Sequence, residues 1–226
     1  ARMCNALLLP TSGTVTVDGM DTADESALWD IRSRVGFVQQ NPDNQIVGTV
    51  VEEDVAFGPE NLGVPSDELR RRVDAALEAV GLVGFERREP HLLSEGQKQR
   101  LAIAGALAMQ PAYLVLDEAT SMLDPAGRAD VLDVVRRLKA AGVATLVISH
   151  HLADVADADR AVVLERGRVA YSGPVGALFE SPERAAALGL DLPLMARLTA
   201  RLRDQGIDVS RLALQTEAVL EALWHS

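Results

Sequence analysis

Apolar residues along this chain form short runs that alternate with longer segments of helical spacing. Two continuous runs, Tyr113–Leu116 and Ala144–Ile148, are each followed by polar residues. Short runs rich in leucine or β-branched residues are typical of strands buried on both faces of a parallel sheet. Residues 125–141 lie between them and have helical spacing, so the pattern predicts a strand–helix–strand unit.

The remaining segments predict further strands and helices. Residues 14–17 alternate polar and apolar side chains up to Asp18-Gly19, which predicts a half-buried strand and a hairpin turn. Residues 2–9 have the pattern of the end of a helix. Residues 49–110 are mostly helical in pattern, with breaks expected around Gly58-Pro59, Gly63–Pro65 and Gly81–Gly84. The other predicted elements are a strand at 35–39, a hairpin at 161–171 and helices after residue 174.

Composition places the chain among globular proteins and narrows its partners. Hydrophobic residues make up 48% of its 226 residues, and no apolar run approaches the roughly 18 residues of a membrane-spanning helix. Its 33 acidic and 22 basic residues give a net charge of −11, which disfavours a nucleic-acid partner because such binding needs clustered Lys and Arg. The single cysteine, Cys4, excludes an intramolecular disulfide and fits a reducing compartment.

The segment Leu93-Ser94-Glu95-Gly96-Gln97 is the most specific string in the sequence. Ser94 and Gln97 have the spacing of a capping box, which predicts that a helix begins here. The free N–H groups and the positive dipole of a helix N-terminus attract anions. An ordinary helix cap explains Ser94 and Gln97 alone, but it does not explain the whole string with Gly96.

Two acidic residues end the first apolar run. Asp117 and Glu118 follow Leu116, at the carboxyl end of a predicted central strand, where α/β sheets bind ligands. Side chains alternate along a strand, so one carboxylate can hold Mg²⁺ through water while the other polarises an attacking water. A solvated turn is the alternative interpretation. It is disfavoured because two acids at the end of a dry strand are costly to desolvate without a cation or partner.

Three further polar residues lie beside predicted strand ends or helix starts. Asp124 precedes Pro125 and is expected to cap the following helix. His150 follows the second apolar run, at the same sheet edge as Asp117, where a histidine can contact phosphate or water. Gln40 follows a short strand and carries no meaning by itself.

Taken in order and spacing, these motifs resemble those of the ATP-binding cassette (ABC) ATPases. Residues 93–97 look like the signature motif, and Asp117-Glu118 looks like the second phosphate-site motif with its catalytic glutamate. Residues 121–124 are similar to the D-loop. Gln40 matches the Q-loop, and His150 matches the switch histidine.

The resemblance covers residues 1–180 and implies a fold that composition could not indicate. It implies an α/β fold with a P-loop NTPase-like core, a small antiparallel β element at about 13–39 and a helical subdomain at about 50–108. Residues 181–226 are expected to form a C-terminal helical extension.

A finer resemblance points to the energy-coupling-factor (ECF) subgroup of importers. Residues 41–45 and 53–63 look like that subgroup, and residues 190–216 are similar to its C-terminal extension. This implies ATP and Mg²⁺ as cofactors and a second ATPase subunit, identical or related, paired head to tail. It also implies integral-membrane coupling and substrate-binding subunits at the cytoplasmic face of the cell membrane. The expected activity is ATP hydrolysis that energises import of a vitamin or transition-metal ion.

The resemblance also implies a role for each matched residue. Glu118 would activate water, His150 would steady the γ-phosphate, and Asp124 would couple the two sites of a dimer. Asp117 and Gln40 would hold Mg²⁺, partly through water. The residues implied to bind ATP or Mg²⁺ are Gln40, Asp117, Ser94, Gly96 and Gln97.

The sequence departs from the family's pattern in three places, the mildest of which is His151, where an acid is common in the family. The phosphate-binding loop, Gly-x-x-x-x-Gly-Lys-Ser/Thr, is absent, and the only lysines are Lys98 and Lys139. We interpret this as a chain that begins after that loop and, as written, binds ATP poorly. The second departure is Glu95, which stands where the family usually has glycine and brings a carboxylate near the expected γ-phosphate.

Two other functions stay open. A non-catalytic ABC partner subunit would lack the phosphate loop, but Glu118 and His150 are both retained. A soluble ABC ATPase not linked to transport would usually carry coiled coils or zinc modules, and neither occurs here. The transported substrate would be selected by a separate membrane subunit, and the chain could pair with its own copy or with a relative.

Overall fold

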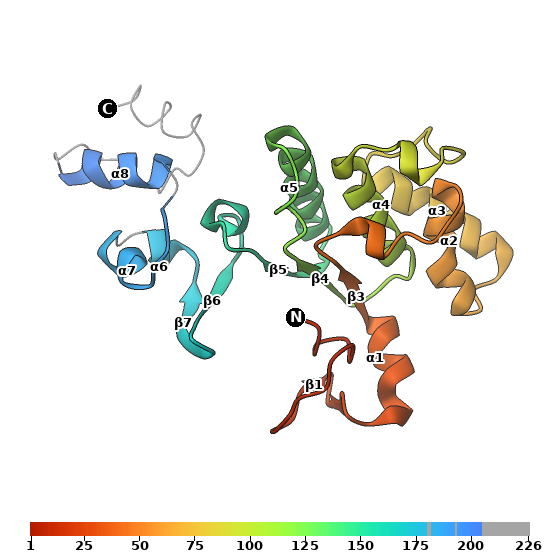
Figure 1. The fold of residues 1–226 in the computed structure, drawn as a ribbon, viewed down its shortest axis with the longest axis horizontal. Helices are drawn as coiled ribbons and strands as arrows, with labels where there is room; N and C mark the ends of the chain where they lie inside the picture. The colour runs from red at the N-terminus through yellow and green to blue at the C-terminus, as the bar shows by residue number, and fades with distance from the viewer. Residues whose placement is uncertain (180–181, 193, 205–226) are drawn as a thin grey trace. The chain divides into compact units, whose positions relative to one another are not determined.

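The computed structural model describes residues 1–179, 182–192 and 194–204, whose helices and strands are drawn in Figure 1. The chain divides into two compact units, Ala1–Ser149 and His150–Ser226. Among the described residues, no helix has the length and apolar character needed to cross a membrane.

A three-stranded parallel sheet forms the centre of the first unit. Its strands are β3 (Val35–Val38), β4 (Tyr113–Asp117) and β5 (Ala144–Ile148), in the order β3-β4-β5. The inner residues of β4 are at most 2% exposed, so β4 is buried on both faces as predicted. β5 departs from that prediction, since Leu146 is 48% exposed. β5 is, like β3, an edge strand of this sheet within the described residues, but the faces of β5 are covered only in part.

Four helices pack around this sheet. Helices α2 (Val51–Asn61), α3 (Ser66–Ala79) and α4 (Glu95–Ala108) lie side by side in Figure 1, and α5 (Pro125–Ala140) connects β4 to β5 as predicted. The apolar faces of these helices share one core with the sheet. Its fully buried side chains include Val51, Leu77, Leu101, Ile103 and Leu114.

The break expected at Gly58-Pro59 is wrong, because α2 runs through both residues. Pro59 has no N–H, so the helix loses one backbone hydrogen bond there. Gly58 faces Met109 so closely that a Cβ on this glycine would lie 2.8 Å from the Met109 side chain. Packing of α2 against α4 therefore outweighs the local preference of these two residues.

The N-terminal segment contains one wrong prediction and one confirmed one. Residues 2–9 form turns instead of the end of a helix, and Ala6 has a positive φ of 55°. So short a segment forms too few helical hydrogen bonds to offset the entropy of nucleation. The predicted hairpin is present: β1 (Thr16–Val17) pairs with β2 (Met20–Asp21). Both residues of the Asp18-Gly19 turn have positive φ, as a type I′ turn requires. Helix α1 (Leu28–Arg34) then leads into β3.

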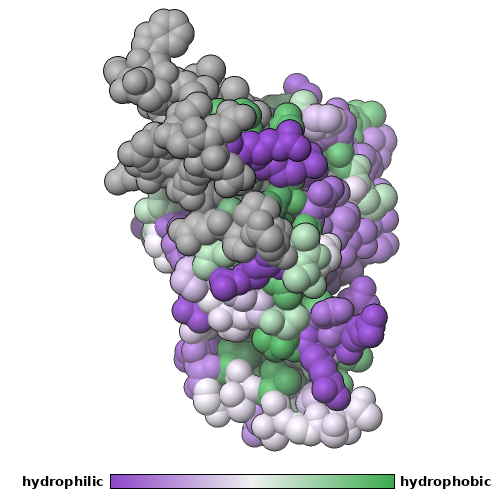
Figure 2. Space-filling view, turned by 90° about the vertical axis from the view of Figure 1, so that its left-hand side faces the viewer, coloured by the Kyte–Doolittle hydropathy of each residue, from purple (hydrophilic) through white to green (hydrophobic). Residues whose placement is uncertain are grey.

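Within the described residues, the second unit contains the predicted antiparallel hairpin and the α-helices that follow it. Its elements are β6 (Arg160–Glu165), β7 (Arg168–Pro174), α6 (Gly176–Phe179), α7 (Pro182–Ala187) and α8 (Leu194–Asp204). Leu178, Phe179 and Ala196 are among its buried side chains. The hairpin also carries exposed Val162 and Leu164. Figure 2 shows one face of the molecule, on which green hydrophobic residues lie among purple hydrophilic ones.

The domain boundary expected near residue 180 stays a prediction. The helical extension expected over 181–226 likewise stays a prediction, although α7 and α8 lie within that span. Its remainder, residues 205–226, lies outside the described residues.

Candidate functional site

The segments that follow β3 and β4 bring Gln40 and Glu118 together. The Nε2 atom of Gln40 donates to Oε2 of Glu118 at 3.2 Å and to Oγ of Ser121 at 3.0 Å. Ser121 in turn donates through its hydroxyl to the Glu118 carbonyl at 2.9 Å. These three side chains form a hydrogen-bonded group at the carboxyl end of the sheet, where α/β proteins bind ligands.

The backbone at Glu118 turns sharply as β4 ends. Glu118 has a positive φ of 52°, an uncommon conformation for a residue other than glycine. Its N–H donates to the carbonyl of Ile148 at 3.0 Å, so the turn is fastened to the end of β5. Asp117 is the last residue of β4 and pairs in register with Ile148. The two acids are therefore held in fixed positions by the sheet itself.

The predicted capping box at the start of α4 is present. Ser94 Oγ accepts from the Gln97 N–H at 3.3 Å, and Gln97 Oε1 accepts from the Ser94 N–H at 3.0 Å. Gly96, which lies between Ser94 and Gln97 in the string, is buried. A Cβ on Gly96 would lie 3.0 Å from the Cα atom of Gly127 in α5. Only a glycine at position 96 lets the two helices approach so closely.

Asp124 caps α5, as the sequence predicts. Its Oδ1 atom accepts from the Gly127 N–H at 2.8 Å, and Pro125 takes the first position of the helix. Because Gly127 also lies against Gly96, the starts of α4 and α5 meet. The fold thus brings the Leu93–Gln97 string beside the segment that contains Asp124.

Glu95 is turned toward a lysine. The Nζ atom of Lys98 lies 3.0 Å from Oε1 of Glu95 and 2.9 Å from Oδ1 of Asp43. The hydrogen bonds that Lys98 donates to Asp43, and next to Glu95, raise the pKa of Lys98, so its ammonium is retained. The negative charge at Glu95 is therefore compensated by Lys98 within the same helical turn.

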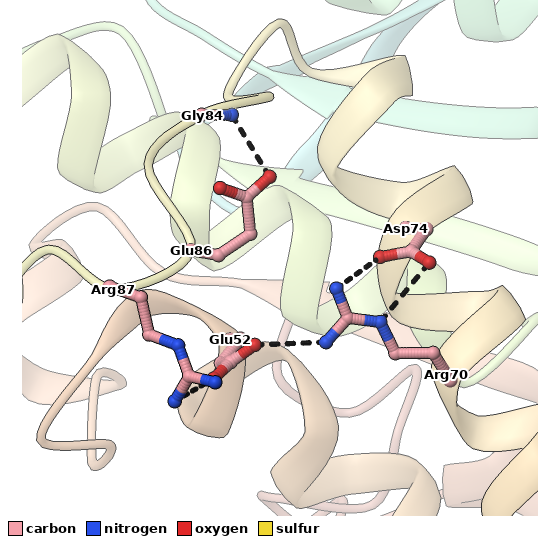
Figure 3. A network of polar contacts seen from close by, with 6 residues as sticks. All are labelled: Glu52, Arg70, Asp74, Gly84, Glu86 and Arg87. Atoms are coloured by element: carbon pink, nitrogen blue, oxygen red, sulfur yellow. Dashed lines mark hydrogen bonds and ion pairs between the residues drawn. The ribbon is translucent and has the colours of Figure 1, made fainter.

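The loop that leads into Ser94 is fastened to the start of α2, as Figure 3 shows. Glu52 accepts from Arg87 of this loop at 2.7 Å and from Arg70 of α3 at 3.0 Å. Arg70 also pairs with Asp74 at 3.0 Å. The backbone N–H of Glu52 donates to the carbonyl of Glu86 at 3.0 Å. These contacts tie three segments of the helical group together ahead of α4.

His150 is exposed and is the first residue of the second unit. Its ring centroid lies 4.1 Å from that of His151. A role for His150 beside Glu118 stays a prediction.

Sequence reasoning missed two residues next to Gln40. Gln45 and Gln99 both bond to the backbone of Gln39. Gln99 is fully buried on α4, three residues after Gly96 and four before Ile103. A polar residue on the apolar, buried face of a helix is unusual, and this feature of the sequence could have singled out Gln99.

The site and the fold together define an ABC-type ATPase domain, and comparisons with known proteins agree. The model of the ABC transporter family matches residues 1–121. The chain is 57% identical over 224 residues to the energy-coupling factor transporter ATP-binding protein EcfA1 of Symbiobacterium thermophilum, covering 99% of this chain and 78% of that relative. It is 47% identical over 225 residues to EcfA1 of Bacillus subtilis, covering 99% of this chain and 80% of the relative. The chain therefore belongs to the ABC transporter family, whose ATPase domains bind nucleotide and drive transport.

Solved structures support the same assignment. Its fold is similar to that of cbiO1 from Clostridium perfringens, described as part of the ABC transporter complex cbiONQ, with a TM-score of 0.73 and 34% identity. That match covers 88% of this chain and 80% of the other. A dimeric ATP-binding cassette in a post-hydrolysis state, bound to ADP and Pi, is similar with a TM-score of 0.66 and 28% identity over 77% of this chain and 78% of the other.

Proposed function

We propose that this chain is the ATP-hydrolysing subunit that energises an ECF-type importer of a vitamin or transition-metal ion. The names of its relatives support the ECF assignment. The observation that carries the catalytic part is the contact of Gln40 with Glu118, with 3.2 Å between Nε2 and Oε2. It puts an amide that can sense a bound metal against the carboxylate that would accept a proton from water.

The side chains of this group are suitable ligands for a shared Mg²⁺ ion. Mg²⁺ takes one or two carboxylates and completes its octahedral shell with water and phosphate oxygens. Asp117 offers a carboxylate at the end of β4, and Gln40 offers an amide oxygen next to Glu118. Among the described residues no group of three or more His, Cys, Asp or Glu side chains is placed to hold a metal. Asp117 and Gln40 would therefore hold Mg²⁺ together with ATP, whose phosphate charge the bound metal would neutralise.

A second ATPase subunit, identical or related, would complete the site. Ser94, Gly96 and Gln97 would close over ATP that is held by the partner, since the start of α4 offers N–H groups and a positive dipole to an anion. Asp124 would couple the two sites, because its helix begins against Gly96. His150 would steady the γ-phosphate. The dimeric form of a similar cassette supports this pairing.

A groove beside Gln40 supports docking of an integral-membrane coupling subunit. The groove has a volume of about 320 Å³ and lies between β3, α2 and α4. Leu7, Val47 and Phe57 line it and are each more than half exposed, so they present apolar surface for a partner to cover. Gln39 also lines the groove, so a partner docked in it would lie next to Gln40. Through such partners, including a substrate-binding subunit, the chain would lie at the cytoplasmic face of the cell membrane.

The test is Glu118→Gln in the complete subunit, assembled with its partners. We expect ATP binding to persist while hydrolysis falls by a factor of about 10² to 10⁴, as removal of a general base requires. Glu60→Gln, an exposed change on α2, is the matched control and should leave both unchanged. Undiminished hydrolysis in the Glu118 variant would contradict the role. It would also favour the alternative, a non-catalytic partner subunit, if a paired relative carried all of the activity.

A further inference from the structure

Two glutamine side chains hold the backbone of Gln39, the residue before Gln40. Oε1 of Gln45 accepts from the Gln39 N–H at 3.1 Å, and Nε2 of Gln99 donates to the Gln39 carbonyl at 3.1 Å. Gln45 also donates to the carbonyl of Phe37 at 3.0 Å. Its amide thus pairs with the end of β3 as a neighbouring strand would. We call Gln45 and Gln99 the amide clamp.

Gln99 is a costly residue to bury. Its side chain is fully buried on α4, and its Oε1 atom has no hydrogen-bond partner among the described residues. An unsatisfied buried acceptor destabilises a fold, whereas a leucine of similar size would avoid that cost. The contribution of Gln99 must therefore come from the one hydrogen bond that it does make, to the Gln39 carbonyl.

The amide clamp joins α4 to the catalytic group. Lys98, the neighbour of Gln99, reaches the same loop through its ion pair with Asp43. Gln99 holds the backbone at Gln39, and the next side chain, Gln40, donates to Glu118. The helix that begins at Ser94 is therefore connected to the Glu118 carboxylate by two hydrogen bonds, which are linked through the backbone of Gln39 and Gln40.

We propose that Gln45 and Gln99 are positioning residues for ATP hydrolysis. Together they fix the backbone before Gln40, so that its side chain stays against Glu118. Gln99 also makes that position follow α4 when the start of this helix closes over nucleotide. The inference rests on the proposed ATPase function and deepens it.

The first test needs no nucleotide. Backbone hydrogen exchange at Gln39 and Gln40 is measured in the wild type, Gln99→Leu and Gln45→Leu. We expect exchange to become about tenfold faster in each variant, because Gln99→Leu loses one hydrogen bond to this segment and Gln45→Leu loses two. Ile103→Val, at a fully buried position of the same helix, is the control and should leave exchange at Gln39 unchanged. Wild-type exchange rates in both clamp variants would overturn the proposal.

The second test separates positioning from folding in the assembled, complete complex. Gln99→Leu and Gln45→Leu should each lower kcat about tenfold with the KM for ATP unchanged. Their melting temperatures should stay close to that of Ile103→Val. The kcat of the double variant should be lowered by less than the product of the two single effects, because both residues act on Gln39. Wild-type kcat, or a loss of activity that only follows a loss of folded protein, would overturn the proposal. If even the wild-type complex hydrolyses no ATP, the proposed function fails while the exchange measurement still tests the clamp.

Discussion

Gly96 and Gly127 lie in direct backbone contact, since a Cβ on Gly96 would stand 3.0 Å from Cα of Gly127. Gly96 belongs to the string that opens α4, and Gly127 to the first turn of α5, where Asp124 caps the helix. The contact makes the two helix starts one rigid junction. A movement of α4 is therefore passed directly to Asp124, without a flexible side chain between them.

Gly96→Ala should destabilise the protein. The added methyl meets backbone that cannot rotate away, and overpacking of this kind costs about 1–3 kcal/mol, more than the ~1 kcal/mol that alanine gains in helix propensity. Gly105→Ala on the same helix is the control, because its Cβ would meet only Asp54 O, at 3.8 Å. That change should stabilise by about 0.5–1 kcal/mol. Urea unfolding of both variants checks the pair, and equal effects would contradict the close contact.

Glu95→Gly should leave ATP hydrolysis unchanged or raise it. The Glu95 carboxylate is turned toward Lys98, which also pairs with Asp43 and keeps that partner in the variant. Removing the carboxylate therefore takes one negative charge from the region of the expected γ-phosphate without freeing the lysine. Steady-state ATPase rates of the assembled complex test this, and a clear fall would show that Glu95 contributes to turnover.

Asp54 should make stability depend on pH in an unusual direction. This carboxylate is buried and accepts from the N–H groups of Val47 and Gly48 at 2.7 and 2.9 Å. Burial raises its pKa above the ordinary value. Between the unfolded pKa of about 3.9 and the raised folded pKa, the native state binds more protons than the unfolded state, so this group's contribution to stability falls as pH rises.

Asp54→Asn removes that dependence while keeping an acceptor for both N–H groups. We expect the free energy of unfolding of the wild type, relative to the variant, to increase as pH is lowered from 7 toward 4. Chemical unfolding at several pH values measures the difference. A difference that is constant with pH, or that shrinks as pH falls, would show that Asp54 does not carry a raised pKa.

The Glu52 network of Figure 3 should contribute modestly to stability. Glu52 is only 14% exposed in its side chain, but its partners Arg70 and Arg87 are 57% and 84% exposed. Ion pairs this open to water are worth less than about 1 kcal/mol and weaken in salt. Glu52→Gln should therefore lower the free energy of unfolding by less than about 1 kcal/mol, and added salt should shrink the difference. Glu60→Gln, on the same helix, should have no effect, and a loss that salt leaves unchanged would point to packing instead.

Local patterns predicted those elements whose signal lies in a few adjacent residues. The β4 run, the Ser94 cap and the Asp18-Gly19 turn are of this kind, and each is present. The prediction failed where distant packing decides. Gly58-Pro59 is helical because Met109 packs on it, and β5 is half-exposed because its faces are covered only in part.

The residues of the candidate site likewise divide into those that a sequence motif predicts and those whose role depends on contacts in the folded protein. The order of motifs was enough to single out Gln40 and Glu118, and the structure brings their side chains within hydrogen-bond distance. The motif order could not indicate that Gln45 and Gln99 share the backbone of Gln39, because Gln99 lies on a helix 60 positions further along the chain and the contact of Gln45 depends on how the intervening loop turns back. Nor could it show that Glu95 faces Lys98, which depends on side-chain rotamers.

The position of β5 at the sheet edge has a consequence for handling the protein. A strand edge presents N–H and C=O groups that another polypeptide can use as a template for pairing. The net charge of −11 keeps copies apart in dilute buffer, but at about 0.15 M salt the screening length shortens to about 8 Å. We expect colloidal stability of this chain to decline as salt is added, which is the opposite of what an assembly held by ion pairs would do.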